Sequence, residues 1–180
     1  MHTYIALLRG INVGGHKKIT MMDLQASFKE LGFDKVRSYL QSGNLIFESS
    51  DSHCPSVIKK VKDKLLEDFG FSIPLLVKTP GDLNKIINNN PFLKKRGIDS
   101  AKLHVSFLSE SPLNGALKEL NDIETGKDIF HCLRTEIYLY CPGGYGRTKL
   151  SNNFLEKVLS VEATTRNWKT VNELYRISSE

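Results

Sequence analysis

The chain has 180 residues, of which 40% are hydrophobic and 25% are charged, so it is an ordinary globular chain and wholesale disorder is excluded. No apolar run approaches the roughly 20 residues that a membrane-spanning helix needs, so we expect no membrane protein. The net charge of +5 permits binding of phosphate or nucleic acid but does not by itself argue for either.

The first half is predicted to alternate between strands and helices. The strand Thr3–Arg9 is apolar at nearly every position, which indicates a strand that is covered on both faces, with the other half of the chain as a candidate cover. The other predicted elements are a helix from Thr20 to about Leu31, strands at Asp34–Leu40 and Asn44–Glu48, a helix at Pro55–Asp68, a strand at Ile73–Lys78 and a trailing helix at Pro80–Asn89.

The second half is predicted to repeat this order. Its predicted elements are a strand at Lys102–Leu108, a helix at Pro112–Asn121, strands at Lys127–Cys132 and Glu136–Tyr140, a helix at Ser151–Ser160, a short strand at Val161–Thr165 and a closing helix at Arg166–Ser178. The repeat lies in the order of the elements and not in residue identity. The alternative is the alternation that any α+β chain of this size shows.

The order β-α-β-β-α-β is that of the ferredoxin-like unit. The predicted fold is therefore α+β, a tandem of two ferredoxin-like subdomains, each followed by an extra helix. We expect the first subdomain and its trailing helix at residues 1–90, a linker at 91–101, and the second subdomain with the C-terminal helix at 102–180.

The first candidate site is the glycine-rich, basic segment that follows the first strand. Small residues let backbone N–H groups approach an anion, and an arginine suits phosphate or carboxylate. In the ferredoxin-like unit the first strand and the second strand end at the same edge, so the hairpin at residues 41–44 is expected beside this segment. The candidate ligand-binding residues are Arg9, Asn12, Gly14, Gly15, Lys17, Gln41, Ser42 and Asn44. The alternative is a flexible loop with solvated lysines beside polar groups that satisfy turn backbone.

The second candidate site lies at the corresponding edge of the second half. Cations beside aromatic rings can bind phosphate and stack on a flat ring. The candidate residues are Tyr145, Arg147, Lys149, Arg166, Asn167 and Trp168. The alternative has Trp168 packed in the core and the three cations solvated.

Other chemistry has little support in the sequence. The three cysteines, Cys54, Cys132 and Cys141, are an odd number without paired spacing, so we expect no disulfide framework and a cytoplasmic location. The histidines show no metal-binding spacing, so no metal site is predicted, and no cofactor is predicted. No nucleophile motif or nucleotide fingerprint is present, so the catalytic residues stay unknown.

Four segments of the chain resemble a bacterial family known only as domain of unknown function 1697. They are Tyr4–Gly15 and Tyr39–Asn44 in the first half, and Gly144–Leu150 and Ala163–Val171 in the second half. The resemblance runs along essentially the whole chain and implies a cytosolic bacterial protein with two α+β subdomains. It implies no activity, because none is established for the family.

Three functional hypotheses follow from these observations. The leading one is a protein that binds a phosphorylated ligand, a nucleotide or a nucleic-acid fragment, through the two glycine-rich basic loops. The alternatives are an enzyme that acts on a small anionic metabolite and a non-catalytic module that binds a protein partner. Salt distinguishes the first two, because contacts with a nucleic-acid backbone weaken steeply as salt rises. The oligomeric state cannot be read from the sequence.

Overall fold

The structure is a computed structural model that describes residues 1–12 and 18–180. The chain divides into two compact units: the first unit is Met1–Asn84 together with Leu174–Glu180, and the second unit is Lys85–Glu173. The first unit thus takes in the C-terminal end of the chain. The ranges 1–90 and 102–180 stay a prediction about where independent subdomains begin and end.

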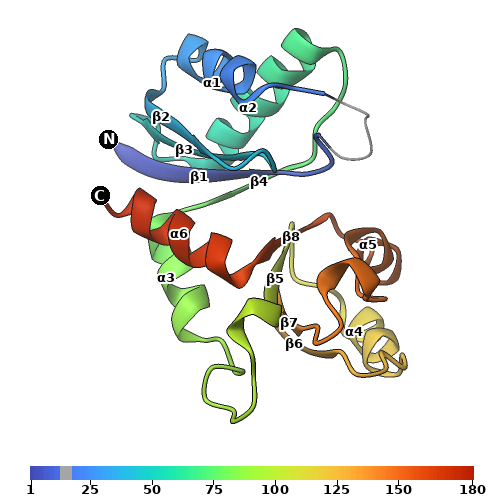
Figure 1. Cartoon of the computed structure of the whole chain (residues 1–180). Helices are drawn as coiled ribbons and strands as arrows, with labels where there is room; N and C mark the ends of the chain where they lie inside the picture. Colours follow the sequence, from blue (N-terminus) through green and yellow to red (C-terminus); the bar gives the residue numbers. More distant parts are fainter. Residues whose placement is uncertain (13–17) are drawn as a thin grey trace. The chain divides into compact units, whose positions relative to one another are not determined.

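The first unit contains a four-stranded antiparallel sheet in the order β2-β3-β1-β4. Helices α1 and α2 lie side by side over one face of this sheet (Figure 1). Its elements are β1 (His2–Leu8), α1 (Met21–Glu30), β2 (Asp34–Tyr39), β3 (Asn44–Ser49), α2 (Cys54–Phe69) and β4 (Leu75–Lys78). This is the predicted ferredoxin-like arrangement.

The second unit repeats the topology with the sheet order β6-β7-β5-β8. Its elements are β5 (Leu103–Leu108), α4 (Asn114–Asn121), β6 (Ile129–Leu133), β7 (Glu136–Tyr140), α5 (Asn152–Leu159) and β8 (Ala163–Asn167). Helix α3 (Pro80–Asn88) follows the first set of elements, and helix α6 (Trp168–Ser178) follows the second. The tandem of two ferredoxin-like subdomains, each with an extra helix, is therefore confirmed.

Helix α1 shows how local sequence sets these elements. The hydroxyl of Thr20 accepts a hydrogen bond from the Asp23 N–H at 3.0 Å and donates one to Oδ2 of Asp23 at 2.7 Å, which caps the helix N-terminus. Leu24 and Phe28 lie four residues apart and are both fully buried, so one stripe of the helix faces the sheet.

The core between the helices and the first sheet is an aromatic cluster. The ring of Phe47 on β3 lies 5.1 Å from the ring of Phe28 and 4.6 Å from that of Phe33, measured between centroids. Tyr4 on β1 adds a fourth ring at 5.7 Å from Phe47. Such pairs add about 0.5–1.5 kcal/mol each beyond the burial of their area, so this cluster joins α1 to the centre of the sheet.

The opposite faces of both sheets are also buried at their centres. In the first unit Ile5, Leu7 and Ile46, which point away from α1 and α2, are at most 1% exposed. In the second unit the hydroxyl of Tyr138 donates a hydrogen bond to the carbonyl oxygen of Ile86 in α3 at 3.0 Å. The central strands are therefore buried on both faces, while the expectation that the other half of the chain provides the cover stays a prediction.

The end of the chain differs from the sequence-based prediction. The sequence predicts that the last strand ends at Thr165 and that the closing helix begins at Arg166, but β8 continues to Asn167. The Oδ1 atom of Asn167 accepts a hydrogen bond from the Thr170 N–H at 2.7 Å, so Asn167 caps α6 and delays the start of the helix. Arg166 consequently lies in a strand, paired with Val105 of β5.

A substitution of Gly43 tests the packing of the hairpin between β2 and β3. An added Cβ atom would lie 2.8 Å from Cδ1 of Ile11 and 2.9 Å from Cβ of Leu8, on a backbone with φ of +77°. We expect Gly43→Ala to lower the free energy of unfolding by about 3 kcal/mol, as the sum of backbone strain and overpacking. Urea denaturation measures this loss.

Gly70 supplies the matched control for this prediction. Its φ of +74° is nearly the same, but an added Cβ atom would meet nothing within 4 Å. We expect Gly70→Ala to cost only about 1 kcal/mol, which is the backbone strain alone. Equal losses in the two variants would contradict the claim that Gly43 is needed for close packing.

Candidate functional site

The segment after β1 and the β2–β3 hairpin meet at one edge of the first sheet. The Leu8 N–H donates a hydrogen bond to the Gly43 carbonyl oxygen at 2.8 Å. The backbone of Gly43 lies so close to the side chains of Leu8 and Ile11 that no Cβ atom would fit between them. The structure therefore brings together the two segments that the topology placed side by side.

Asn12 is the residue that organises this edge. Its Oδ1 atom accepts a hydrogen bond from the Ile19 N–H at 2.9 Å, and its Nδ2 atom donates to the Ile19 carbonyl oxygen at 2.8 Å. The same Nδ2 atom lies 3.2 Å from the carbonyl oxygen of Gln41 in the hairpin. Asn12 has a positive φ of 56°, a conformation that asparagine adopts more readily than most residues. Asn12 thus positions its neighbours, and its amide is occupied by backbone groups.

The polar residues of the hairpin divide into two kinds. Asn44 is fully buried, and its Nδ2 atom donates to the Tyr39 carbonyl oxygen at 2.8 Å and to Oγ of Ser42 at 3.0 Å. These contacts stabilise the hairpin and leave the Asn44 amide nitrogen with no role toward a ligand. Gln41 and Ser42 are exposed at the turn.

A shallow depression of about 490 Å³ lies beside the N-terminus of α1. Its lining combines polar residues with an apolar side and consists of Asn12, Lys18, Ile19, Thr20, Met21, Met22 and Gln41. Arg9 is half-buried directly after β1, and its backbone N–H donates to the Pro74 carbonyl oxygen at 2.9 Å. The predicted residues Gly14, Gly15 and Lys17 lie outside the described residues.

Sequence reasoning missed several residues of this depression. The sequence predicts that a helix starts at Thr20 and places Lys18 in the glycine-rich, basic segment before it, but it names neither as a ligand-binding residue. Met21 and Met22 gave no signal, because a half-buried and an exposed methionine at the start of a helix resemble any residues in such positions. The available signal for Thr20 and Lys18 was their position at a capped helix N-terminus, where backbone N–H groups lack partners in the helix.

The second cluster is brought together only in part. The rings of His104 and Tyr145 are stacked, with centroids 4.9 Å apart and an interplanar angle of 26°. His104 is the cross-strand partner of Asn167 in the pairing of β5 with β8. The loop after β7 therefore does reach the end of β8, as the topology predicted, with Tyr145 stacked on the strand partner of Asn167.

The cations of the second cluster point to different places. Arg166 is only 8% exposed and donates hydrogen bonds to Oγ1 of Thr164 at 2.8 Å and to the Thr165 carbonyl oxygen at 3.0 Å. Burial lowers the pKa of Arg166 to about 10, an effect that the nearby Tyr145 partly opposes. Lys149 is exposed and donates to the Glu124 carbonyl oxygen at 3.0 Å.

The remaining two residues of the second candidate site, Trp168 and Arg147, lie in different environments. Trp168 is 8% exposed, which matches the alternative in which it packs in the core. Arg147 is exposed in a short 3₁₀ turn, Tyr145–Arg147. The predicted cationic and aromatic residues of the second half therefore do not form one surface.

A chain of hydroxyl and amide groups lies next to His104 and was not found from the sequence. The Oγ atom of Ser106 lies 2.6 Å from Oγ1 of Thr165, which donates to Oδ1 of Asn152 at 2.7 Å. These residues come from β5, β8 and the start of α5. Only the cross-strand register brings them together, so no motif in the sequence could have predicted the contact.

Thiol and metal chemistry find little support among the described residues. Burial raises the pKa of Cys54 and Cys132 above its ordinary value and that of Cys141 to about 11, so all three thiols are held in their unreactive protonated form. Across residues 1–12 and 18–180, no group of three acidic, cysteine or histidine side chains is placed to hold a metal ion. Within the same residues no helix is long and apolar enough to span a bilayer.

Arg166 and Arg147 provide a test of which arginine is structural. We expect Arg166→Ala to lower the free energy of unfolding by about 2–4 kcal/mol, because it removes buried hydrogen bonds and leaves a cavity. The exposed Arg147→Ala variant should stay within about 0.5 kcal/mol of the wild type. Urea denaturation of both variants measures the difference, and an unchanged stability of Arg166→Ala would contradict the structural role.

His104 predicts a pH dependence of stability. Its burial lowers its pKa below the ordinary value of about 6.5, so the unfolded chain takes up this proton before the folded chain does. Stability is therefore expected to fall as the pH drops below about 6.5. We expect His104→Phe, which keeps a ring against Tyr145, to lose less stability than the wild type between pH 7.5 and pH 5.

Denaturant titrations across this pH range measure the effect. His131→Phe serves as the control, because His131 is exposed on the edge strand β6. Parallel pH profiles for the wild type and His104→Phe would show that His104 is not the group responsible.

The comparisons with known proteins agree with this fold. A solved structure of the conserved bacterial protein SP0830 from Streptococcus pneumoniae is similar, with 24% identity over 98% of each chain and a TM-score of 0.77, which shows a shared fold. No curated protein matches the chain. The family model described as "Protein of unknown function (DUF1697)" matches residues 1–138, which leaves the segments at 144–150 and 163–171 outside the matched range. Since that match covers well over half of the sequence, the chain belongs to the DUF1697 family.

Proposed function

We propose that the first unit binds a phosphorylated ligand, a nucleotide or a nucleic-acid fragment, in the depression beside the N-terminus of α1. The observation that supports this proposal is that a capped helix N-terminus, the exposed Lys18 and the hairpin residue Gln41 surround one hollow of about 490 Å³. The second cluster is not part of the proposal, because Arg166 and Trp168 are buried there.

Electrostatics favours an anion at this position. The N–H groups of the first helical turn have no partner within the helix and carry partial positive charge. Lys18 adds a full positive charge from the same rim. The negative carboxylate of Asp23 opposes this field, but it accepts a hydrogen bond from the Thr20 hydroxyl. The same hydroxyl caps the helix by accepting a hydrogen bond from the Asp23 N–H. The lysine is therefore the residue on which phosphate binding should depend most.

The apolar side of the depression favours a ligand with a flat ring beside its phosphate. Ile19, Met21 and Met22 line this side. A methionine thioether packs well against an aromatic ring and adapts to different shapes. A nucleotide satisfies both sides, because its phosphate suits Lys18 and its base suits the methionines.

The buried sheet argues for a short ligand in this unit. Ferredoxin-like domains that read RNA stack bases on exposed aromatic residues at the face of the sheet. The equivalent face here carries Ile5, Leu7 and Ile46, which are buried and aliphatic. In the first unit a ligand would therefore bind at the edge of the sheet, where the depression accommodates a mononucleotide or a few nucleotides.

A protein partner is the second candidate, because apolar residues are exposed at the same edge. Met22 is 77% exposed and Leu40 in the hairpin is 53% exposed. Exposed apolar side chains of this size next to polar groups are typical of interaction surfaces. In that case small phosphorylated compounds would leave the protein unaffected.

Thermal unfolding with candidate ligands tests the proposal. The compounds are ATP, AMP, ribose 5-phosphate and inorganic phosphate. A ligand at one hundred times its dissociation constant adds about 2.7 kcal/mol, which raises the melting temperature by roughly 5–10 °C for a chain of this size. We expect at least one nucleotide to produce such a shift and Lys18→Gln to abolish it.

Lys29→Gln is the matched control, because Lys29 is exposed in the last turn of the same helix and loses the same charge. This variant should keep the full shift. A shift with ribose 5-phosphate but not with AMP would indicate a small phosphorylated metabolite as the ligand. If none of the compounds shifts the unfolding temperature, or if Lys18→Gln keeps the shift, the depression is not a phosphate site and the protein partner becomes the better hypothesis.

A further inference from the structure

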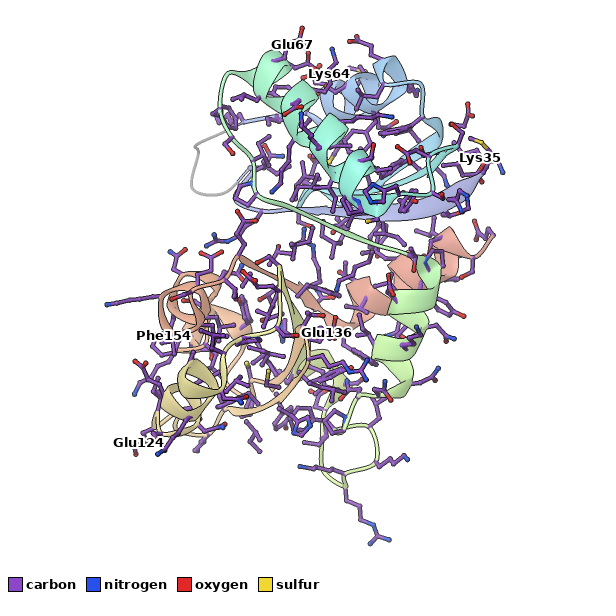
Figure 2. The ribbon with its side chains drawn as sticks, turned by 180° about the vertical axis from the view of Figure 1, so that it is seen from behind. Lys35, Lys64, Glu67, Glu124, Glu136 and Phe154 are labelled. Atoms are coloured by element: carbon purple, nitrogen blue, oxygen red, sulfur yellow. The ribbon has the colours of Figure 1, made fainter. Side chains whose placement is uncertain are left out.

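A basic turn projects from the second unit between α3 and β5. We define the basic turn as residues Phe92–Arg96. Figure 1 shows this segment as a loop that extends away from the second sheet, and Figure 2 shows the same loop from behind. Leu93 is 49% exposed, and Lys94, Lys95 and Arg96 are all exposed.

The basic turn is anchored at its start. Phe92 is 1% exposed, and its N–H donates a hydrogen bond to Oδ1 of the buried Asn90 at 3.0 Å. The Lys95 N–H donates in turn to the Phe92 carbonyl oxygen at 3.0 Å, and the Lys95 ammonium lies 5.1 Å from the centroid of the Phe92 ring. The cations are therefore presented from a defined turn.

The positive charge of the basic turn is not compensated locally. In the part of the chain that the structure describes, Lys94, Lys95 and Arg96 form no ion pair with an acidic side chain. The nearest acidic residue along the chain, Asp99, accepts a hydrogen bond from the Ala101 N–H at 2.9 Å and caps the short turn before β5. Three adjacent cations thus face solvent together.

An aromatic ring lies beside the basic turn. The ring of Tyr140, the last residue of β7, is 6.4 Å from the ring of Phe92 between centroids. Tyr140 is half-buried and pairs with Ile129 of the edge strand β6, which is 46% exposed. On the same face, the Tyr138 hydroxyl is hydrogen-bonded to α3 at the centre of the sheet. Tyr140 is therefore the tyrosine of this face that lies toward the sheet edge formed by β6.

We propose that the basic turn and Tyr140 together bind single-stranded nucleic acid. The three cations would contact successive phosphates, while the Tyr140 ring would stack on one unpaired base and Ile129 would support it. A single strand fits because its bases are free to reach a ring, whereas a duplex hides them. This site belongs to the second unit and does not depend on the phosphate site proposed for the first.

Fluorescence anisotropy with labelled twelve-nucleotide oligo(U) and oligo(dT) tests the proposal. The variant carries Lys94→Gln, Lys95→Gln and Arg96→Gln. Three lost phosphate contacts should lower affinity by about one hundredfold at 0.1 M salt and reduce the slope of log K against log salt by about 2. The control carries Lys59→Gln, Lys60→Gln and Lys62→Gln on α2. It also removes three positive charges, and it should bind nearly as the wild type does.

Tyr140 is tested by a pair of substitutions that separate stacking from packing. Tyr140→Phe keeps the ring and should bind as the wild type does. Tyr140→Leu keeps apolar bulk against Phe92 but has no ring, and we expect it to lose about tenfold in affinity at every salt concentration. Equal affinities of these two variants would overturn the stacking role.

Three outcomes would overturn the proposal as a whole. If the two triple variants weaken binding equally, the affinity depends on the net charge of the protein and not on the basic turn. Equal affinity for a duplex of the same length would exclude recognition of a single strand. Equal affinity for a poly-glutamate peptide would assign the basic turn to an acidic protein partner. The loss caused by the basic-turn triple variant should be the same in the Lys18→Gln background as in the wild type, which separates this test from that of the phosphate site.

Discussion

The side chain of Asn12 is the interaction on which the candidate site depends. By bonding both backbone groups of Ile19 and the carbonyl oxygen of Gln41, it holds the start of α1 and the hairpin at one sheet edge. Ile19 is buried as a result, and Thr20 follows it directly as the cap of α1. An amide can do this because it donates and accepts at the same time, which neither a carboxylate nor an ammonium group can do.

The second constraint is that both sheets are buried at their centres on both faces. Ferredoxin-like proteins that bind RNA use one open face, but here that face carries aliphatic residues in the first unit and a tyrosine bonded to α3 in the second. Both proposed sites accordingly lie at the ends or edges of strands. The depression at α1 lies at such a strand end, and the basic turn lies at such an edge beside Tyr140.

Local signals predicted most of the fold. Local sequence patterns located the elements, and topology alone placed the hairpin beside the segment after β1. Side-chain roles were harder, because they depend on contacts across strands. The burial of Asn44 and Arg166 and the pairing of Ser106 with Thr165 follow from register, which no local motif specifies. The extension of β8 was missed because Asn167 caps α6 and starts that helix two residues later than the pattern predicts.

The most direct test of the central claim is a map of backbone amide signals by two-dimensional NMR while AMP is added to the full chain. The account predicts saturable changes at residues 18–23 and at Gln41, around the N-terminus of α1, with signals of the second unit nearly unchanged. Changes confined to the second unit, or no saturable change up to millimolar AMP, would contradict it.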